Sequence, residues 1–199
     1  AYNDASHGTA TANLDFSANN PTFTAFVSDD LSIGREVGAG YHLSTAANGS
    51  LTLASNSALH LGTAAALATL NIGWGQPGHG SSYGGSATGV LDALAKDAVV
   101  DLHLSELNVG RGSYNSYGTG TLKWNQTEVI TAPNAYFGRG NATGNLDVAT
   151  GGEFHLGTDT ERIANLRIAY NDASHGTATA NLDFSVNNPT FTAFVSDDL

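Results

Sequence analysis

Apolar and polar residues alternate over short stretches of the chain, and the same stretches recur along its length. One pattern, in which two apolar residues flank a variable residue and are followed by Gly or Ala, occurs at Leu31–Gly34, Leu70–Gly73, Leu107–Gly110, Ala135–Gly138 and Leu166–Ala169. A period of two places apolar side chains on one face and polar side chains on the other, as in a half-buried strand. The pattern therefore predicts short β-strands.

A second and a third strand are predicted after each copy of this first one. The second contains a small residue followed two positions later by Leu, and its leucines are Leu14, Leu51, Leu91, Leu122, Leu146 and Leu182. The third is predicted at Leu59–Leu61, Leu102–Leu104, Val129–Thr131, Phe154–Leu156 and Phe191–Ala193. Stacking places each strand beside its equivalent at about 4.8 Å and closes an apolar interior. We expect an all-β fold, a parallel β-helix (β-solenoid) with three short strands per coil.

The inward residues of the first and second strands are expected to form the core ladder. Besides the leucines of the second strand, this ladder includes Ile33, Ile72, Val109, Phe137 and Ile168 of the first strand. The Gly or Ala that follows is expected at a corner, where a positive φ or close packing disfavours larger side chains. The alanine run at Ala64–Ala68 is too short for a stable helix, and we expect a turn there.

The chain also repeats on a longer scale. Residues 169–199 copy residues 1–31 with a single change, Ala18 to Val186, so the sequence returns to itself after 168 residues. We expect about five coils per 168-residue unit, within one continuous domain over 1–199 that is part of a longer tandem array. The expected coils are approximately 1–30 (partial), 31–69, 70–106, 107–134, 135–165 and 166–198.

Composition narrows the range of partners. Eighteen acidic against seven basic residues give a formal net charge of −11, and Cys is absent. The charge disfavours nucleic acid and anionic membranes, and no apolar stretch approaches the ~20 residues of a membrane span, so no membrane insertion is expected in this segment. The absence of Cys excludes disulfides and thiolate metal sites. We expect no cofactor and no metal.

The repeats resemble the passenger β-helices of bacterial autotransporters and surface proteins with autotransporter-associated β-strand repeats. The resemblance rests on Gly49–Leu53, Leu59–Gly62 and Leu70–Gly73. It implies export, display at the bacterial cell surface and adhesion. A 168-residue copy is less usual for a passenger, and it favours a fibre or sheath component.

One row of residues offers candidate binding chemistry. The residue after each corner is Arg35, Trp74, Arg111, Arg139 or Tyr170, and stacking would place these side chains above one another. They are interpreted either as a strip that binds glycans by ring stacking or as a cation–π ladder that stiffens one edge, and the second interpretation is favoured.

Other charged positions are expected to be solvated. On the second strand, Lys123 should lie between Asp92 and Asp147 and relieve their repulsion. His60, His103 and His155 are expected in one outward slot of the third strand, although their coils are not all adjacent, which disfavours metal binding.

The main enzymatic alternative is a β-helix polysaccharide lyase or hydrolase. Its nearest candidate carboxylates are Asp29 and Asp30, which recur as Asp197 and Asp198, and both pairs are expected to be corner residues that bond their own backbone. We therefore expect no catalytic residue. The favoured function is an extracellular filament, sheath or stalk formed by end-to-end or lateral self-assembly, and the alternative is an adhesin that binds surface glycans or neighbouring cells.

Overall fold

The chain is all-β, with its strands in parallel sheets. The computed structural model describes residues 1–4, 8–17, 22–37, 45–76, 84–173, 175–187 and 189–198, and none of these residues is helical. All strand pairs are parallel, which confirms the predicted strand class and is consistent with a parallel β-helix-like fold. The alanine run forms a tight turn in which Thr63 and Ala66 exchange backbone hydrogen bonds of 2.8 and 3.1 Å.

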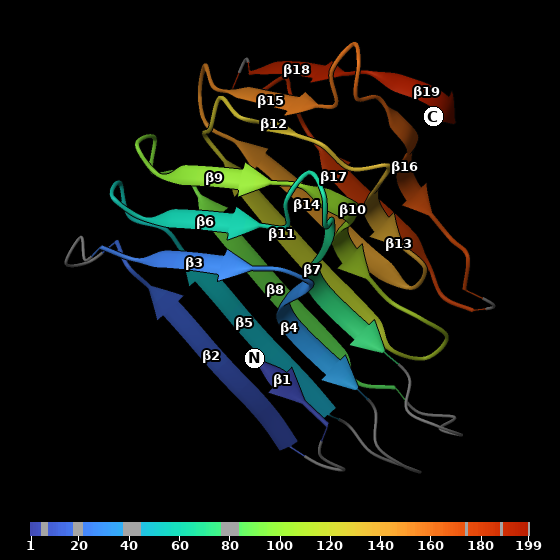
Figure 1. The fold of residues 1–199 in the computed structure, drawn as a ribbon. Helices are drawn as coiled ribbons and strands as arrows, with labels where there is room; N and C mark the ends of the chain where they lie inside the picture. Colours follow the sequence, from blue (N-terminus) through green and yellow to red (C-terminus); the bar gives the residue numbers. More distant parts are fainter. Residues whose placement is uncertain are drawn as a thin grey trace.

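Each sheet joins every third strand of the chain, so the chain visits the sheets in turn (Figure 1). The largest sheet has seven strands, in the order β1 (Tyr2–Asn3), β4 (Asp30–Val37), β7 (Ala68–Gln76), β10 (Leu104–Arg111), β13 (Asn134–Arg139), β16 (Ile163–Tyr170) and β19 (Val195–Asp198). The second has six, in the order β17 (Ala178–Leu182), β14 (Ala142–Val148), β11 (Tyr117–Trp124), β8 (Ser86–Ala93), β5 (Thr45–Thr52) and β2 (Gly8–Asp15). Two further sheets have three strands each, β3 (Thr24–Val27), β6 (Ala58–Leu61) and β9 (Val99–Leu102), and β12 (Val129–Ile130), β15 (Glu153–Leu156) and β18 (Thr190–Ala193).

Leucines and isoleucines from successive strands are direct neighbours. In the six-stranded sheet the successive Cα partners are Leu14, Leu51, Leu91, Leu122, Leu146 and Leu182. In the seven-stranded sheet they are Ile33, Ile72, Val109, Phe137 and Ile168. Most of these residues belong to a single apolar core, which also buries Trp124 and Phe154.

The expected core ladder is wrong at Leu14 and Ile168, whereas Leu182 packs against the core. Leu14 is 54% exposed and Ile168 is 49% exposed, and Leu182 is only partly buried. Leu14 and Leu182 lie in edge strands, and β16 pairs with β19 only near Ile163 and Asn165, which leaves Ile168 uncovered. Exposure of the ladder therefore rises toward the ends of the stack, although Ile33 stays buried next to the short strand β1.

The corner after the first strand requires a residue with positive φ. Four glycines occupy it with φ between 68° and 75°, namely Gly34, Gly73, Gly110 and Gly138, and Ala169 occupies it with φ 55°. A Cβ added at Gly73 would lie 1.9 Å from the carbonyl oxygen of Thr119, in the facing six-stranded sheet. Both the φ and the close approach of two backbones therefore select glycine here.

The predicted alignment of the third strand is wrong by two residues in the coil that contains His103. His60 is the Cα partner of Asp101, His103 bridges to Thr131 and His155 pairs with Val129, so His103 lies two residues outside the slot that His60 and His155 share. Val100, Leu102 and Leu104 are all buried, and this run of period two fits either of two alignments that differ by two residues.

The structure shows which residue of the short strand β12 faces inward. Ile130 is buried and pairs with Leu156, whereas Val129 lies on the outer side opposite His155. Two adjacent β-branched residues fit a strand in either phase, so the short segment Val129–Thr131 does not by itself decide which side chain faces inward.

Candidate functional site on the outer face of the seven-stranded sheet

The row of residues after the corner forms a continuous ladder across the seven-stranded sheet. Its members are successive Cα partners, and we call them the outer ladder: Tyr2, Arg35, Trp74, Arg111, Arg139 and Tyr170. Five of them were candidates in the sequence. Tyr2 was missed, although it is the copy of Tyr170 in the 168-residue repeat and could have been found from it.

Trp74 is held between two arginines. The guanidinium carbon of Arg35 lies 4.1 Å from the centroid of the Trp74 ring, and that of Arg111 lies 4.6 Å from it. These arginines come from β4 and β10, the strands on either side of β7, so they cover opposite faces of the ring. Each such contact contributes about 0.5–2 kcal/mol, depending on how far it is desolvated.

Beyond Arg111, the arginines stack on tyrosine rings instead of on Trp74. Arg139 stacks on Tyr136 of its own strand at 4.4 Å, and Arg167 stacks on Tyr170 at 4.3 Å. The rings of Tyr136 and Tyr170 lie 6.1 Å apart. Tyr136 and Arg167 therefore complete the stacking, although their place in the sequence did not indicate that they belong to the ladder.

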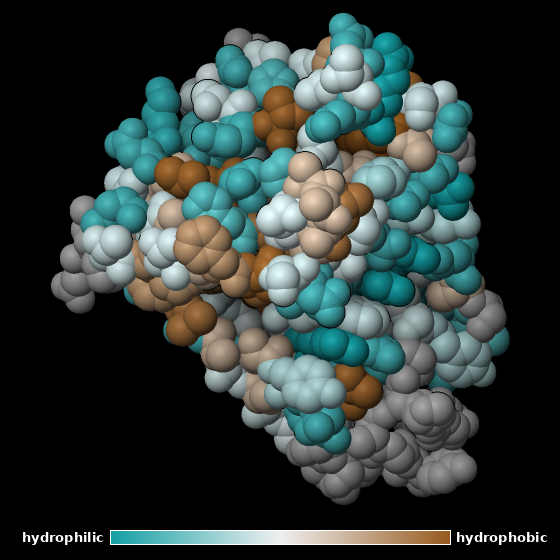
Figure 2. All heavy atoms as spheres, viewed as in Figure 1, coloured by the Kyte–Doolittle hydropathy of each residue, from teal (hydrophilic) through white to brown (hydrophobic). Residues whose placement is uncertain are grey.

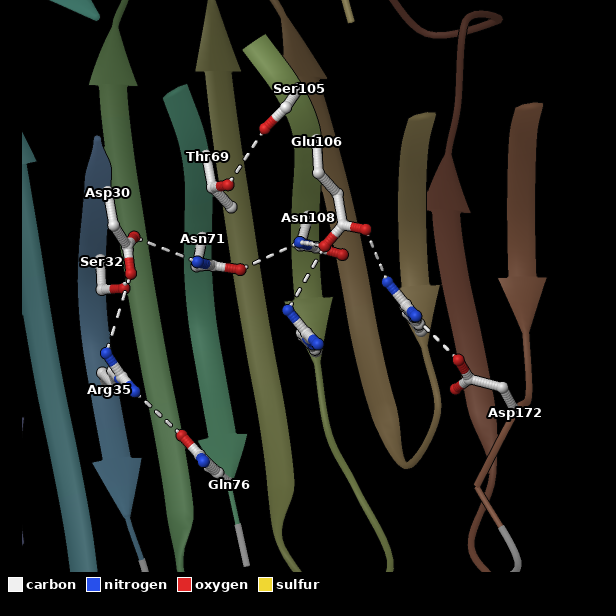
Figure 3. A network of polar contacts seen from close by, with 12 residues as sticks. Asp30, Ser32, Arg35, Thr69, Asn71, Gln76, Ser105, Glu106, Asn108 and Asp172 are labelled. Carbon is white, nitrogen blue, oxygen red and sulfur yellow. Dashed lines mark hydrogen bonds and ion pairs between the residues drawn. The ribbon is translucent and has the colours of Figure 1, made fainter. Parts of the chain in front are cut away.

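A polar network runs beside the ladder on the same face of the sheet (Figure 3). The Asn71 amide donates to Asp30 at 3.2 Å, and the Asn108 amide donates to Asn71 at 2.9 Å and to Glu106 at 2.7 Å. Asn71 and Asn108 are buried by these neighbours. Because each amide bridges two strands, the network fixes the register of β4, β7 and β10.

Glu106 links the network to the arginines. It accepts hydrogen bonds from Arg111 at 3.3 Å and from Arg139 at 2.9 Å, and Arg139 also donates to Asp172 at 2.9 Å. Burial lowers the pKa of Arg111, and the charge of Glu106 opposes that shift. For Arg139 burial is outweighed by the hydrogen bond to Asp172 and the charge of Glu106, which together raise its pKa. Both guanidinium groups stay charged.

Asp30 is a member of this network rather than a corner residue. Its carboxylate accepts a hydrogen bond from Ser32 at 3.0 Å and forms an ion pair with Arg35 at 3.7 Å. The expectation that Asp30 bonds its own backbone is wrong because β4 begins at Asp30, so its side chain lies on the outer face. Its oxygens already have basic and amide partners.

Two other charged groups lie on other faces. Lys123 is the Cα partner of Asp92 and of Asp147 and forms an ion pair with Asp92 at 3.2 Å. Asp101 lies between His60 and His103, at 3.4 and 3.2 Å. Within the described ranges, no group of three or more His, Cys, Asp or Glu residues is arranged to hold a metal ion.

A shallow depression of about 270 Å³ lies beside the loop that joins β6 to β7. Its lining includes Leu67, His103, Leu104, Pro133 and Arg162. Figure 2 shows apolar side chains gathered over this loop.

The part of the chain that the structure describes contains no helix long and apolar enough to cross a membrane.

Comparisons with protein-family models, with curated proteins and with solved structures found no match to this chain. The outer ladder and its network are therefore interpreted from their own chemistry. Both faces of Trp74 are covered, and the neighbouring charges are paired with one another. A sugar ring needs a free aromatic face on which to stack, so this geometry favours the stiffening interpretation over the glycan strip.

Proposed function

We propose that the chain is a segment of a parallel β-solenoid with three strands per coil, whose 168-residue units stack end to end into an extracellular filament, sheath or stalk. One observation carries the proposal. Tyr2 and Tyr170 are copies of the same repeat position, and they occupy the same row of the seven-stranded sheet, five pairing steps apart. The sequence repeat and the strand stack thus have the same period, so a further unit can continue the stack.

The outer face supports a mechanical role. Amide, carboxylate and guanidinium groups there bond across neighbouring strands, and such bonds must break before the strands slide or separate. Five steps of about 4.8 Å give an axial advance of roughly 24 Å per unit. The proposed location at the bacterial cell surface depends on the resemblance to autotransporter-type repeats.

Electron microscopy of the concentrated chain tests the proposal. We expect filaments whose axial repeat is roughly 24 Å or a small multiple of it. Isolated particles at every concentration would contradict the filament function. An adhesin would instead show glycan binding by the dispersed chain, and Trp74→Ala would abolish that binding if the outer ladder carried it.

A further inference from the structure

The duplicated segment is seen twice in this structure, each time with a different neighbour. Leu14 in the first copy pairs with Leu51, in the strand that follows, whereas Leu182 in the second copy pairs with Leu146, in the strand that precedes. Both are the same position of the 168-residue repeat. The strand of the first copy is therefore paired along one edge, and the equivalent strand of the second copy is paired along the opposite edge.

The two copies share their local structure. Asp15 accepts hydrogen bonds from the Ser17 amide at 2.8 Å and the Ser17 hydroxyl at 2.6 Å, and Asp183 accepts the same two bonds from Ser185 at the same distances. The amide of Asn3 donates to Gly8 O at 3.0 Å, and that of Asn171 donates to Gly176 O at 3.0 Å. These local hydrogen bonds are the same with either neighbour, although the strands differ in extent, since β2 covers Gly8–Asp15 and β17 covers Ala178–Leu182.

The aromatic residues of the two copies are also equivalent. Phe16 stacks on Phe23 at 4.2 Å, and Phe184 stacks on Phe191 at 4.8 Å. Phe191 stacks in addition on Phe154, at 6.2 Å. The segment can thus stack on a preceding strand while it keeps its own internal contacts.

The first copy makes further contacts to the residues that follow it. Asn3 donates a second hydrogen bond to Ala46 O at 2.8 Å, and the guanidinium carbon of Arg35 lies 5.6 Å from the Tyr2 ring. Tyr170 and Asn171 are the same residues at the other end of the stack. The partners that would complete their contacts are therefore copies of Arg35 and Ala46.

We propose that the outer edge of β16, β17 and β18 binds β4, β5 and β6 of a second copy of this chain, in the register seen for the first copy of the segment. Residues 169–199 of one molecule then take the place of residues 1–31 of the next, with Tyr170 opposite Arg35, Leu182 opposite Leu51 and Ala193 opposite Leu59. We call this contact between two molecules the joint. It rests on the proposed stacking function and specifies the register of the stack.

Exchange replaces each lost contact by one from the equivalent position of the repeat, where the sequence differs only by Val186 in place of Ala18. The strands β16, β17 and β18 already pair with β13, β14 and β15, so they gain a neighbour with little further ordering. The displaced segment 1–31 recovers conformational entropy, which offsets the entropy lost when two molecules associate. Association should therefore increase with protein concentration.

Matched substitutions in the two copies test the joint in the full chain. Leu14→Asp weakens the hold of a molecule on its own first segment, so it should lower the concentration at which oligomers form by about tenfold. Leu182→Asp alters the incoming segment and should raise that concentration by about the same factor. Sedimentation velocity over a concentration series measures both, and a shift of the two variants in the same direction would overturn the proposal.

Cysteine pairs test the register, because the chain has no native Cys. Asn13 and Ser50 are Cα partners, so Asn13→Cys with Ser50→Cys should give a disulfide within one molecule. Asn181→Cys with Ser50→Cys should give disulfides between molecules, and Asn181→Cys with Thr52→Cys, which is out of register, should give fewer. Equal yields from the last two pairs would overturn the register.

These experiments separate the joint from the filament function. Filaments that form equally well with Leu182→Asp would retain the function and overturn the joint. Disulfide-linked pairs in the expected register without filaments at any concentration would support the joint and contradict the function.

Discussion

Ile72 and Ile168 hold the same position in the strand pattern but differ in what surrounds them. Ile72 is fully buried, whereas Ile168 is 49% exposed. The strand of Ile72 has a paired neighbour on each side, and the strand of Ile168 has a complete neighbour on one side only. Burial in this fold is therefore set by position in the stack as well as by the residue.

The comparison extends to stability. In a stack whose strands contact only their neighbours, each interface contributes separately, so the middle strands should be held more strongly than the outermost ones. Substitutions at equivalent positions in the middle and at the edge measure this difference directly.

The largest expected effect is at a corner in the middle of the stack. Gly73 and Gly151 both have positive φ, 70° and 67°, but a Cβ at Gly73 would overlap the Thr119 backbone, whereas a Cβ at Gly151 would meet open space. Gly73→Ala should destabilise the chain by more than about 4 kcal/mol. Gly151→Ala, the matched control, should cost about 1 kcal/mol for its backbone conformation alone. Urea denaturation measures both, and equal losses would show that φ alone is responsible.

The next effect compares two leucines of one column. Leu122 is fully buried, and Leu14 is 54% exposed. Leu122→Ala should lower the free energy of unfolding by about 2–5 kcal/mol, because it leaves a cavity between β8 and β14. Leu14→Ala should cost about 1 kcal/mol or less, because much of its side chain remains in water. Similar losses in urea would contradict the difference between middle and edge.

The middle and the edges also differ in how far the sequence predicts them. The spacing of Leu and Ile with a following Gly or Ala was sufficient for the register of the first and second strands, because only one alignment places the leucines in one row and a Gly or Ala at each corner. The third strand has a following glycine only in some coils: Gly62 and Gly157 are present, but His103 and Thr131 occupy the equivalent positions. The run Val100, Leu102, Leu104 therefore allowed an alignment two residues away from the real one.

The polar network could be predicted only in part. The arginines and aromatics share one offset from the corner, and this identified most of the outer ladder. Asn71 and Asn108 also share a slot, which was a usable signal for an amide ladder. The bridging role of Glu106 could not be predicted, because it depends on how far the side chains of Arg111 and Arg139 reach across strands.

The buried carboxyl group of Glu36 makes the stability of the stack depend on pH. It is fully buried opposite Gly75, accepts a hydrogen bond from Thr45, and burial raises its pKa. A raised folded pKa means that the folded chain holds this proton more tightly than the unfolded chain does. The resulting stability is complete below the ordinary Glu pKa and is lost as pH rises through the raised value.

Glu36→Gln should therefore be more stable than the parent chain at pH 7 and no more stable near pH 4. The expected gain is smaller than the loss from Leu122→Ala. Thermal unfolding from pH 4 to pH 8 measures it, and parallel curves for the two proteins would show that the buried carboxyl does not set the pH dependence.

The smallest expected effect returns to the outermost complete strand. Ala169 adopts φ 55° at the corner where the four inner strands have glycine. A residue with a Cβ in this region costs about 1–2 kcal/mol, which glycine removes. Glycine also increases the conformational entropy of the unfolded chain, which lowers the stability by about 0.4–1 kcal/mol. Ala169→Gly should therefore stabilise the chain by about 0.5–1 kcal/mol in urea denaturation. A gain above about 2 kcal/mol would mean that the Ala169 methyl is crowded as a Cβ at Gly73 would be, and that the edge is packed like the middle.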